Sequence, residues 1–171
     1  LKQLGLLPEA EKALREAIKR GRSDSYATAT FFSDAYMNLG EILYELRRLA
    51  EAAAAFRKVI EVDPRRAPAY NNLGGLYLET GRPALAESEF RKASELNPRD
   101  SINCYLLGLS LDLQGRRPQP NAMYRKGNAL GYTDARACGD LGVTLSVMGR
   151  MSQAEEMYRK AIALDPKLVQ G

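Results

Sequence analysis

Residues 67–100 read APAYNNLGGLYLETGRPALAESEFRKASELNPRD, and this stretch decides the fold. The apolar residues of its first half are spaced to form one stripe on a helix: Tyr70, Leu73 and Tyr77. Those of its second half form the stripe of a second helix: Ala86, Phe90 and Ala93. Gly81, between the two, can turn left-handed and end the first helix. The second helix ends ahead of Pro98, because a proline disfavours a helical conformation in the preceding residue. The stretch therefore predicts a helical hairpin.

The same pattern recurs in four contiguous blocks of 34 residues: 33–66, 67–100, 101–134 and 135–168. Counted from the start of each block, positions 7 and 8 are Leu-Gly, and position 24 is aromatic: Phe56, Phe90, Tyr124 and Tyr158. Position 15 is glycine in three blocks, and three blocks close with Asp-Pro or Asn-Pro. One hairpin cannot bury both of its stripes, so neighbouring hairpins are predicted to stack into a continuous array.

Position by position, this pattern resembles the tetratricopeptide repeat family, and the resemblance covers nearly the whole chain. It implies an all-α fold, an α-solenoid with a right-handed superhelix of tandem antiparallel helix pairs, as a single domain over 1–171. It also implies a concave face lined mainly by the first helix of each pair. We further expect Gly40 at position 8 to face Ala52 at position 20, which allows the two helices of a pair to approach closely.

The N-terminal segment 1–24 matches the second half of a repeat, with Leu4-Gly5 at positions 14 and 15. We expect it to be a partial repeat that contributes its second helix only. The next eight residues, 25–32, form an insert that is predicted to lengthen the following helix toward its N-terminus. The incomplete first copy and the lack of a polar capping helix after 168 indicate a fragment of a longer array.

The second helix of block 101–134 departs from the pattern. Pro118 and Pro120 occupy positions 18 and 20, and Gly131-Tyr132 replaces the closing Asp-Pro. Prolines are tolerated in a first turn because those N–H groups lack intrahelical partners, so the helix is expected to form but to begin late. This repeat is expected to be the softest part of the array.

The composition argues against catalysis. The chain has 171 residues, no histidine, two cysteines and a formal net charge of +4. It therefore lacks the usual general base at neutral pH and cannot supply a four-ligand zinc or iron–sulfur site from cysteine and histidine. Cys104 and Cys138 are expected to be free thiols in the core. We expect a soluble non-enzyme without cofactor or metal and without membrane insertion, in a compartment that stays open, with the cytoplasm favoured.

The resemblance places the binding face at positions 2, 5, 6, 9, 12 and 13 of each first helix, from Asn38 to Val147. The candidate peptide-binding residues at these positions are Asn38, Glu41, Asn71, Asn72, Tyr105, Leu106, Leu109, Arg136, Asp140 and Val143. Asn38 and Asn72 both occupy position 6 and either begin an asparagine ladder that holds a peptide backbone or are solvated residues. The apolar residues of 105–109 either form a pocket for a ligand side chain or pack against a terminal helix.

Basic residues recur at positions 25 and 26 of every full block, where they are typical of a solvated helix face. No block is strongly basic, so no nucleic-acid partner is expected. Only the helix within 116–132 lacks an acidic residue, which makes its cations the candidates for an anionic contact: Arg116, Arg117, Arg125 and Lys126.

The sequence thus favours a protein-interaction scaffold that binds an extended peptide or a helix of a partner protein in its concave groove. Two alternatives stay open. The array is a substrate-recruiting arm of a larger enzyme, as in glycosyltransferases with such repeats, or it is a homotypic assembly module that self-associates through its uncapped C-terminal end.

Overall fold

The computed structural model of the protein describes residues 2–22, 28–116 and 119–169 and divides the chain into two units, 1–76 and 77–171. The regular elements of the described residues are α-helices and one 3-10 helix. Consecutive helices are joined by short turns and pack in pairs, so the predicted all-α class and the tandem antiparallel helix pairs are confirmed.

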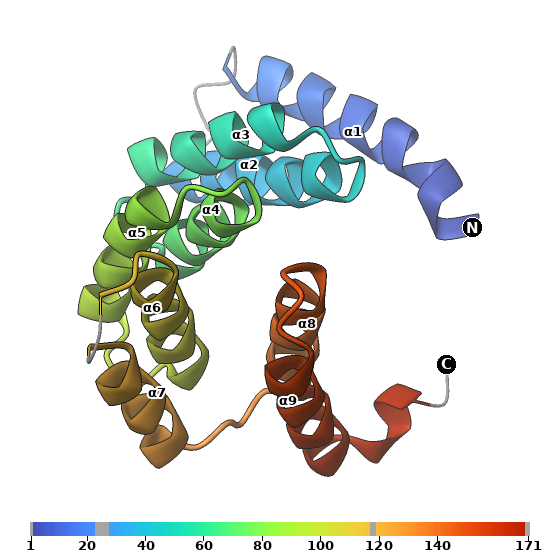
Figure 1. Ribbon diagram of the computed structural model, residues 1–171. Coiled ribbons are helices and arrows are strands. Elements are labelled where there is room, and N and C mark those ends of the chain that lie inside the picture. Colours follow the sequence, from blue (N-terminus) through green and yellow to red (C-terminus); the bar gives the residue numbers. More distant parts are fainter. Residues whose placement is uncertain (1, 23–27, 117–118, 170–171) are drawn as a thin grey trace. The chain divides into compact units, whose positions relative to one another are not determined.

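The first unit holds α1 (Lys2–Gly21), α2 (Ala29–Glu45), α3 (Leu49–Val62) and most of α4 (Ala67–Glu79). Here α1 packs on α2 and α2 packs on α3, side by side in Figure 1. The buried apolar side chains of α2 and α3 form the core of this hairpin: Leu39, Leu43, Ala52, Phe56 and Val59.

The second unit holds the end of α4 and the helices α5 (Pro83–Leu96), α6 (Ser101–Leu113), α7 (Gln119–Leu130), α8 (Ala135–Val147) and α9 (Met151–Leu164). A short 3-10 helix, η1 (Pro166–Val169), follows and packs on α9. Within the unit α6 packs on α5, α7 and α8, and α8 packs on α9, as Figure 1 shows for the last pair.

The turn between the two helices of a repeat has the same geometry in every full block. At position 15 the backbone is left-handed, with φ of 71° at Gly81, 70° at Gly115 and 73° at Gly149. The next residue donates its N–H back to the carbonyl at position 11, as from Arg150 to Leu145 at 2.9 Å. This hydrogen bond is the Schellman closure that a glycine after a helix makes easy.

Arg47 adopts this left-handed conformation without being glycine, with φ of 60°. A side chain strains the backbone there, by about 1–2 kcal/mol. Because glycine also gains freedom in the unfolded chain, Arg47→Gly is expected to raise the free energy of unfolding by only about 0.5–1 kcal/mol. Urea unfolding followed by circular dichroism measures this change. The reverse substitution Gly149→Ala, at the same position of the last repeat, is expected to lower stability by about 1 kcal/mol. A loss of stability in Arg47→Gly would contradict the strain argument.

The segments flanking the first full repeat differ in part from expectation. The helix α1 runs without a break from Lys2 to Gly21, through Gly5 and Pro8, so no turn forms at Gly5 although it matches position 15 of the repeat. A glycine permits a left-handed turn but does not impose one. In the predicted insert, α2 begins at Ala29. Thr28 caps this end of the helix, because its side-chain oxygen accepts a hydrogen bond from the N–H of Phe31 at 3.3 Å. Residues 29–32 therefore lengthen the helix, while 25–27 lie outside the described residues.

The second helix of block 101–134 is present but short. The helix α7 begins at Gln119, whereas α3, α5 and α9 begin two positions earlier in their blocks. Pro118, the first of the two prolines, lies outside the described residues. The late start agrees with the cost of placing prolines inside a helix beyond its first turn.

The glycine at position 8 allows a close approach of the two helices of a pair. A Cβ atom on Gly40 would lie 2.5 Å from the ring of Phe56, and one on Gly142 would lie 2.5 Å from the ring of Tyr158. The aromatic residue at position 24 therefore occupies the space nearest to this glycine. Ala52, which was expected to face Gly40, lies one turn before Phe56 on α3 and is fully buried.

Cys104 and Cys138 are free and buried, on α6 and α8 respectively. Burial raises the pKa of both thiols, so they stay protonated at neutral pH. The prediction of two free core thiols is confirmed.

Candidate functional site

The polar candidates of the first unit lie on its first-type helices, α2 and α4. Asn38 and Glu41 are exposed on α2, and Asn71 and Asn72 are half-buried on α4. The side-chain amide of Asn72 donates to the sulfur of Met37 at 3.6 Å, a weak contact that leaves its carbonyl oxygen able to accept. Two of the four candidates, Asn38 and Glu41, are thus exposed to solvent.

Tyr105 and Leu109, on α6, are buried in the second unit, and Leu106 is half-buried. The ring of Tyr105 packs on the ring of Tyr124 from α7, with centroids 4.7 Å apart. Burial raises the pKa of both phenols, that of Tyr124 to about 12. The expectation that Tyr105 and Leu109 line a ligand pocket does not fit the structure, because both side chains are part of the packed interior.

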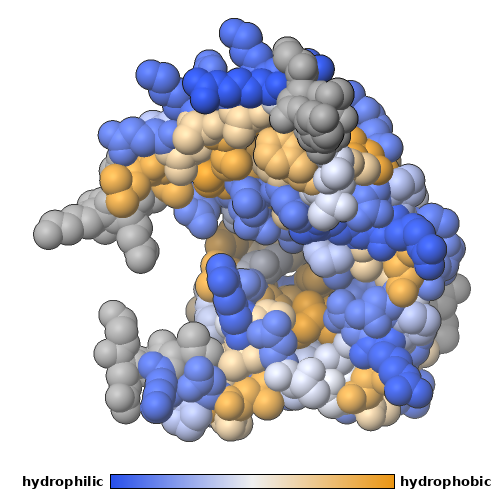
Figure 2. All heavy atoms as spheres, turned by 180° about the vertical axis from the view of Figure 1, so that it is seen from behind, coloured by the Kyte–Doolittle hydropathy of each residue, from blue (hydrophilic) through white to orange (hydrophobic). Residues whose placement is uncertain are grey.

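The candidates on α8 are exposed and share one face. Arg136, Asp140, Val143 and Val147 follow at helical spacing, and Val143 and Val147 expose 55% and 68% of their surface. Figure 2 shows that hydrophobic side chains reach the surface at several places among hydrophilic ones. Desolvation by the surrounding protein raises the pKa of Asp140, an effect that the charge of Arg136 partly offsets. We call these four residues the α8 strip. Val147, at position 13, belongs to it although it was not among the named candidates.

Next to the α8 strip, Gly139 leaves the helix surface open. A Cβ atom built on Gly139 would meet no atom within 4 Å, unlike one on Gly142 in the same helix. The strip therefore has a side where a ligand can approach the helix backbone closely, beside two exposed valines.

The basic candidates do not form one cluster. Arg116 binds the carboxylate of Glu87 at 2.6 Å, so its charge is largely neutralised within the fold. Arg125 and Lys126 are exposed on α7, and Arg117 lies outside the described residues.

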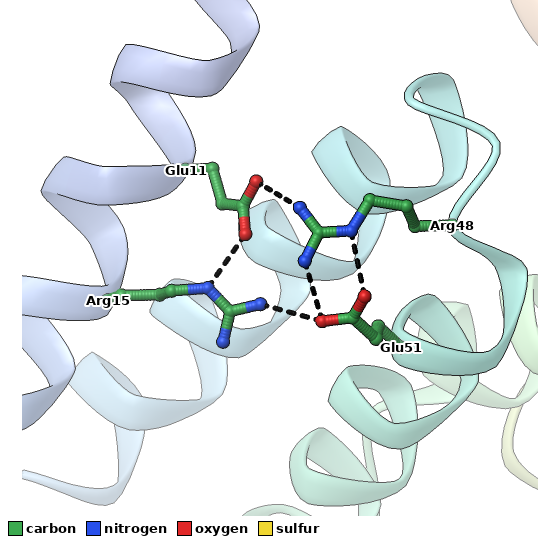
Figure 3. A network of polar contacts seen from close by, with 4 residues as sticks. All are labelled: Glu11, Arg15, Arg48 and Glu51. Carbon is green, nitrogen blue, oxygen red and sulfur yellow. Dashed lines mark hydrogen bonds and ion pairs between the residues drawn. The ribbon is translucent and has the colours of Figure 1, made fainter.

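Contacts between successive hairpins involve Arg116, which was a candidate for an anionic contact, and Arg48, which was not among the candidate residues. Arg48 follows the left-handed turn and binds Glu11 of α1 at 2.6 Å and Glu51 at 2.7 Å, and Arg15 joins both carboxylates (Figure 3). Hydrogen bonding to Arg48 lowers the pKa of Glu51. Four alternating charges in contact therefore link α1 to the turn that precedes α3.

A second junction of this kind lies in the other unit. Glu87 of α5 binds Arg91 at 2.8 Å and Arg116 at 2.6 Å, and Gln114 donates to it at 2.9 Å. Burial by itself raises the pKa of Glu87, but the hydrogen bonds from Gln114 and Arg91 and the charge of Arg116 outweigh it, so the pKa is lowered. The sequence signal for these junctions is arginine at position 16 of every full block: Arg48, Arg82, Arg116 and Arg150.

Two absences among the described residues bear on function. Among residues 2–22, 28–116 and 119–169, no three histidine, cysteine or acidic side chains gather where they could hold a metal ion. In the same part of the chain, every helix is too short or too polar to cross a bilayer.

Family models of the tetratricopeptide repeat match residues 1–64, 38–101 and 135–168. The chain therefore belongs to the tetratricopeptide repeat family, whose helical arrays generally serve as scaffolds for protein interaction. No curated protein matches the sequence.

Solved structures show the same fold. A crystal structure of MamA is 20% identical, with a TM-score of 0.67, over 99% of this chain and 95% of that one. A second structure of MamA protein has a TM-score of 0.66 at 20% identity, over 99% of this chain and 88% of that one. MamA 41-end from Desulfovibrio magneticus RS-1 is also 20% identical, with a TM-score of 0.56, over 92% of this chain and 96% of that one. At this identity the likeness concerns the fold alone.

Proposed function

We propose that this protein is a non-enzymatic scaffold that binds an extended peptide or a helix of a partner protein along the exposed faces of its first-type helices. The observation that carries the proposal is the α8 strip, where two valines are more than half exposed next to two charged residues. Exposed apolar side chains at regular spacing on a rigid element are typical of contact sites. The proposal treats each unit by itself and requires no proton transfer or bound metal.

The chemistry of the α8 strip indicates what it binds. Val143 and Val147 lie one helical turn apart and offer an apolar contact, while Arg136 and Asp140 continue the same face toward the N-terminus of α8. A complementary segment carries one or two large apolar side chains over the valines and polar or oppositely charged groups beyond them. Such apolar anchors supply most of the binding energy in helix-in-groove recognition.

The polar residues of the first unit are suited to a different contact. The amide of Asn38 is exposed and can both donate to a peptide carbonyl and accept from a peptide N–H. Glu41 follows at the next turn of the same face and favours a basic residue in the ligand. In this proposal Asn38 holds the backbone of a bound segment and Glu41 contributes to its selection.

A selection from a displayed library of random peptides, with the whole protein as bait, tests the proposal. The selected peptides are expected to carry apolar anchors and to bind about tenfold or more weakly to the double variant Val143→Ser/Val147→Ser. The matched control is Leu85→Ser, which replaces another exposed apolar residue, 47% exposed on α5, and should leave binding unchanged. Equal binding to all three proteins, or the absence of any selected peptide, would overturn the proposal for the α8 strip.

The same peptides measure the role of the asparagines. If Asn38 and Asn72 hold a peptide backbone, the variant Asn38→Ala/Asn72→Ala binds more weakly to peptides of many sequences, because backbone contacts do not depend on the side chains. Unchanged binding would show that these two residues serve packing and solvation only.

A further inference from the structure

A glutamate at position 21 recurs in every second copy of the repeat. Glu11, Glu87 and Glu155 occupy this position in the partial copy and in the second and fourth full repeats. Each binds the arginine four residues later on its own helix: Arg15 at 2.7 Å, Arg91 at 2.8 Å and Arg159 at 2.6 Å. The same local ion pair is therefore built three times.

Two of these glutamates are covered by the hairpin that follows. Glu11 also binds Arg48, and Glu87 also binds Arg116, each at 2.6 Å and each from the turn of the next hairpin. The side chains of Glu11 and Glu87 are only 11% exposed, whereas that of Glu155 is 63% exposed. The Glu155–Arg159 pair thus consists of the same two residue types as the two covered pairs. It lacks their third member, an arginine from the turn of a following hairpin.

The apolar side chains beside Glu155 show the same contrast. Tyr158 and Ile162 lie on the same face of α9 as Glu155 and are 37% and 44% exposed. The residues at the position of Tyr158 in the first two full repeats, Phe56 and Phe90, are 2% and 0% exposed. We call Glu155, Tyr158, Arg159 and Ile162 the α9 face. It combines an uncovered apolar surface with an uncovered carboxylate.

We propose that the α9 face binds a further helical hairpin of the tetratricopeptide kind, one that carries an arginine directly after its left-handed turn. This arginine binds Glu155 as Arg48 binds Glu11, and the first helix of the hairpin covers Tyr158 and Ile162. The proposal concerns a different surface from the α8 strip and does not depend on it. It rests on two junctions of this chain in which the same three groups already meet.

A second copy of this chain is a poor occupant of the α9 face. In the partial copy 1–24 the residue that corresponds to position 16 is Leu6, which is 65% exposed and carries no charge. Three of its turn arginines already bind acidic groups of their own chain: Arg48, Arg116 and Arg150. Burial of Glu155 by Leu6 would leave the carboxylate with Arg159 alone and would add a desolvation cost.

The test attaches a hairpin of known sequence to the face. A copy of residues 33–66 is added in register after Leu168 of the whole chain, so that its own turn arginine corresponds to Arg48. Amide hydrogen exchange then reports the local stability of the added helices. We expect these helices to be protected, and Glu155→Gln to lower their protection about tenfold, since a charge-assisted hydrogen bond to the arginine is lost.

The matched control is Glu156→Gln, which changes the neighbouring residue, whose carboxylate binds Lys160 at 2.6 Å on the same helix. This substitution is expected to leave the protection of the added helices unchanged. Replacing the turn arginine of the added hairpin with alanine is expected to match the effect of Glu155→Gln, and the two changes together to cost no more than either alone. Added helices that exchange as fast as an unfolded peptide, or an equal loss in both glutamate variants, would overturn the proposal.

The mass of the unmodified chain in solution supplies a second outcome. A dimer that dissociates in Glu155→Gln but not in Glu156→Gln would show that a second copy covers the α9 face, and would also overturn the proposal. A monomer whose added hairpin is protected through Glu155 supports it.

Discussion

Phe90→Ala is expected to lower the free energy of unfolding by about 3–5 kcal/mol. The ring of Phe90 is 0% exposed, so its removal loses the full transfer free energy of the side chain and leaves a cavity in the second unit. The position of the ring on α5 is fixed further by its backbone, because the Phe90 carbonyl accepts a hydrogen bond from the buried amide of Asn103 on α6 at 3.1 Å. The surroundings therefore have little freedom to collapse into the space.

Tyr158→Ala is the matched control, because Tyr158 occupies the same position of the last repeat and is 37% exposed. Its loss is expected to be about 1–2 kcal/mol, since a large part of the ring already contacts water. Urea denaturation followed by circular dichroism measures both variants, with the shift of the midpoint as the readout because repeat arrays can unfold in more than one step. Equal losses at the two positions would show that packing within a hairpin, and not cover by the next hairpin, stabilises the aromatic residue.

Gly142→Ala and Gly139→Ala, two substitutions in the same helix, are expected to have opposite effects. A Cβ atom on Gly142 would lie 2.5 Å from the ring of Tyr158, so the hairpin α8–α9 must open or the ring must move, at a cost of about 1–3 kcal/mol. A Cβ atom on Gly139 meets nothing within 4 Å. Here alanine only improves helix propensity, and the free energy of unfolding is expected to rise by about 1 kcal/mol.

Thermal and urea unfolding of the two variants beside the parent protein measure this difference. The helical content of each folded variant, read from circular dichroism, controls for a global change of fold. A stable Gly142→Ala protein with an unchanged midpoint would contradict the close approach of Tyr158 to α8.

The repeat pattern predicted the helix pairs well because its signals are local. The left-handed turns at Gly81, Gly115 and Gly149 follow from a residue type that tolerates that backbone conformation. The ends of α3, α5 and α9 follow from the Asp-Pro or Asn-Pro pair that comes directly after each helix. The same local rule would place a turn at Gly5, where the chain is helical, because glycine permits a left-handed turn but does not require one.

The candidate site was predicted less well, because the position of a residue in the repeat does not determine whether a neighbouring helix buries its side chain. Leu109 and Val143 occupy the same position of adjacent repeats and were both expected to face a ligand, yet the first is buried and the second is 55% exposed. Which of them contacts a ligand depends on the packing of neighbouring helices, which the position in the repeat does not encode.

The sequence by itself determined the class of fold, the number of residues in each repeat, the turn positions and the family, because these depend on hydrophobic spacing and on the backbone preferences of glycine and proline within one hairpin. Only the tertiary structure decided which of the repeated residues are exposed and can contact a ligand or a partner. Glu87 and Glu155 have the same position and the same arginine partner on their own helix, but Arg116 covers only the first. Burial and charge compensation arise between hairpins, from side chains that come together only when the chain is folded.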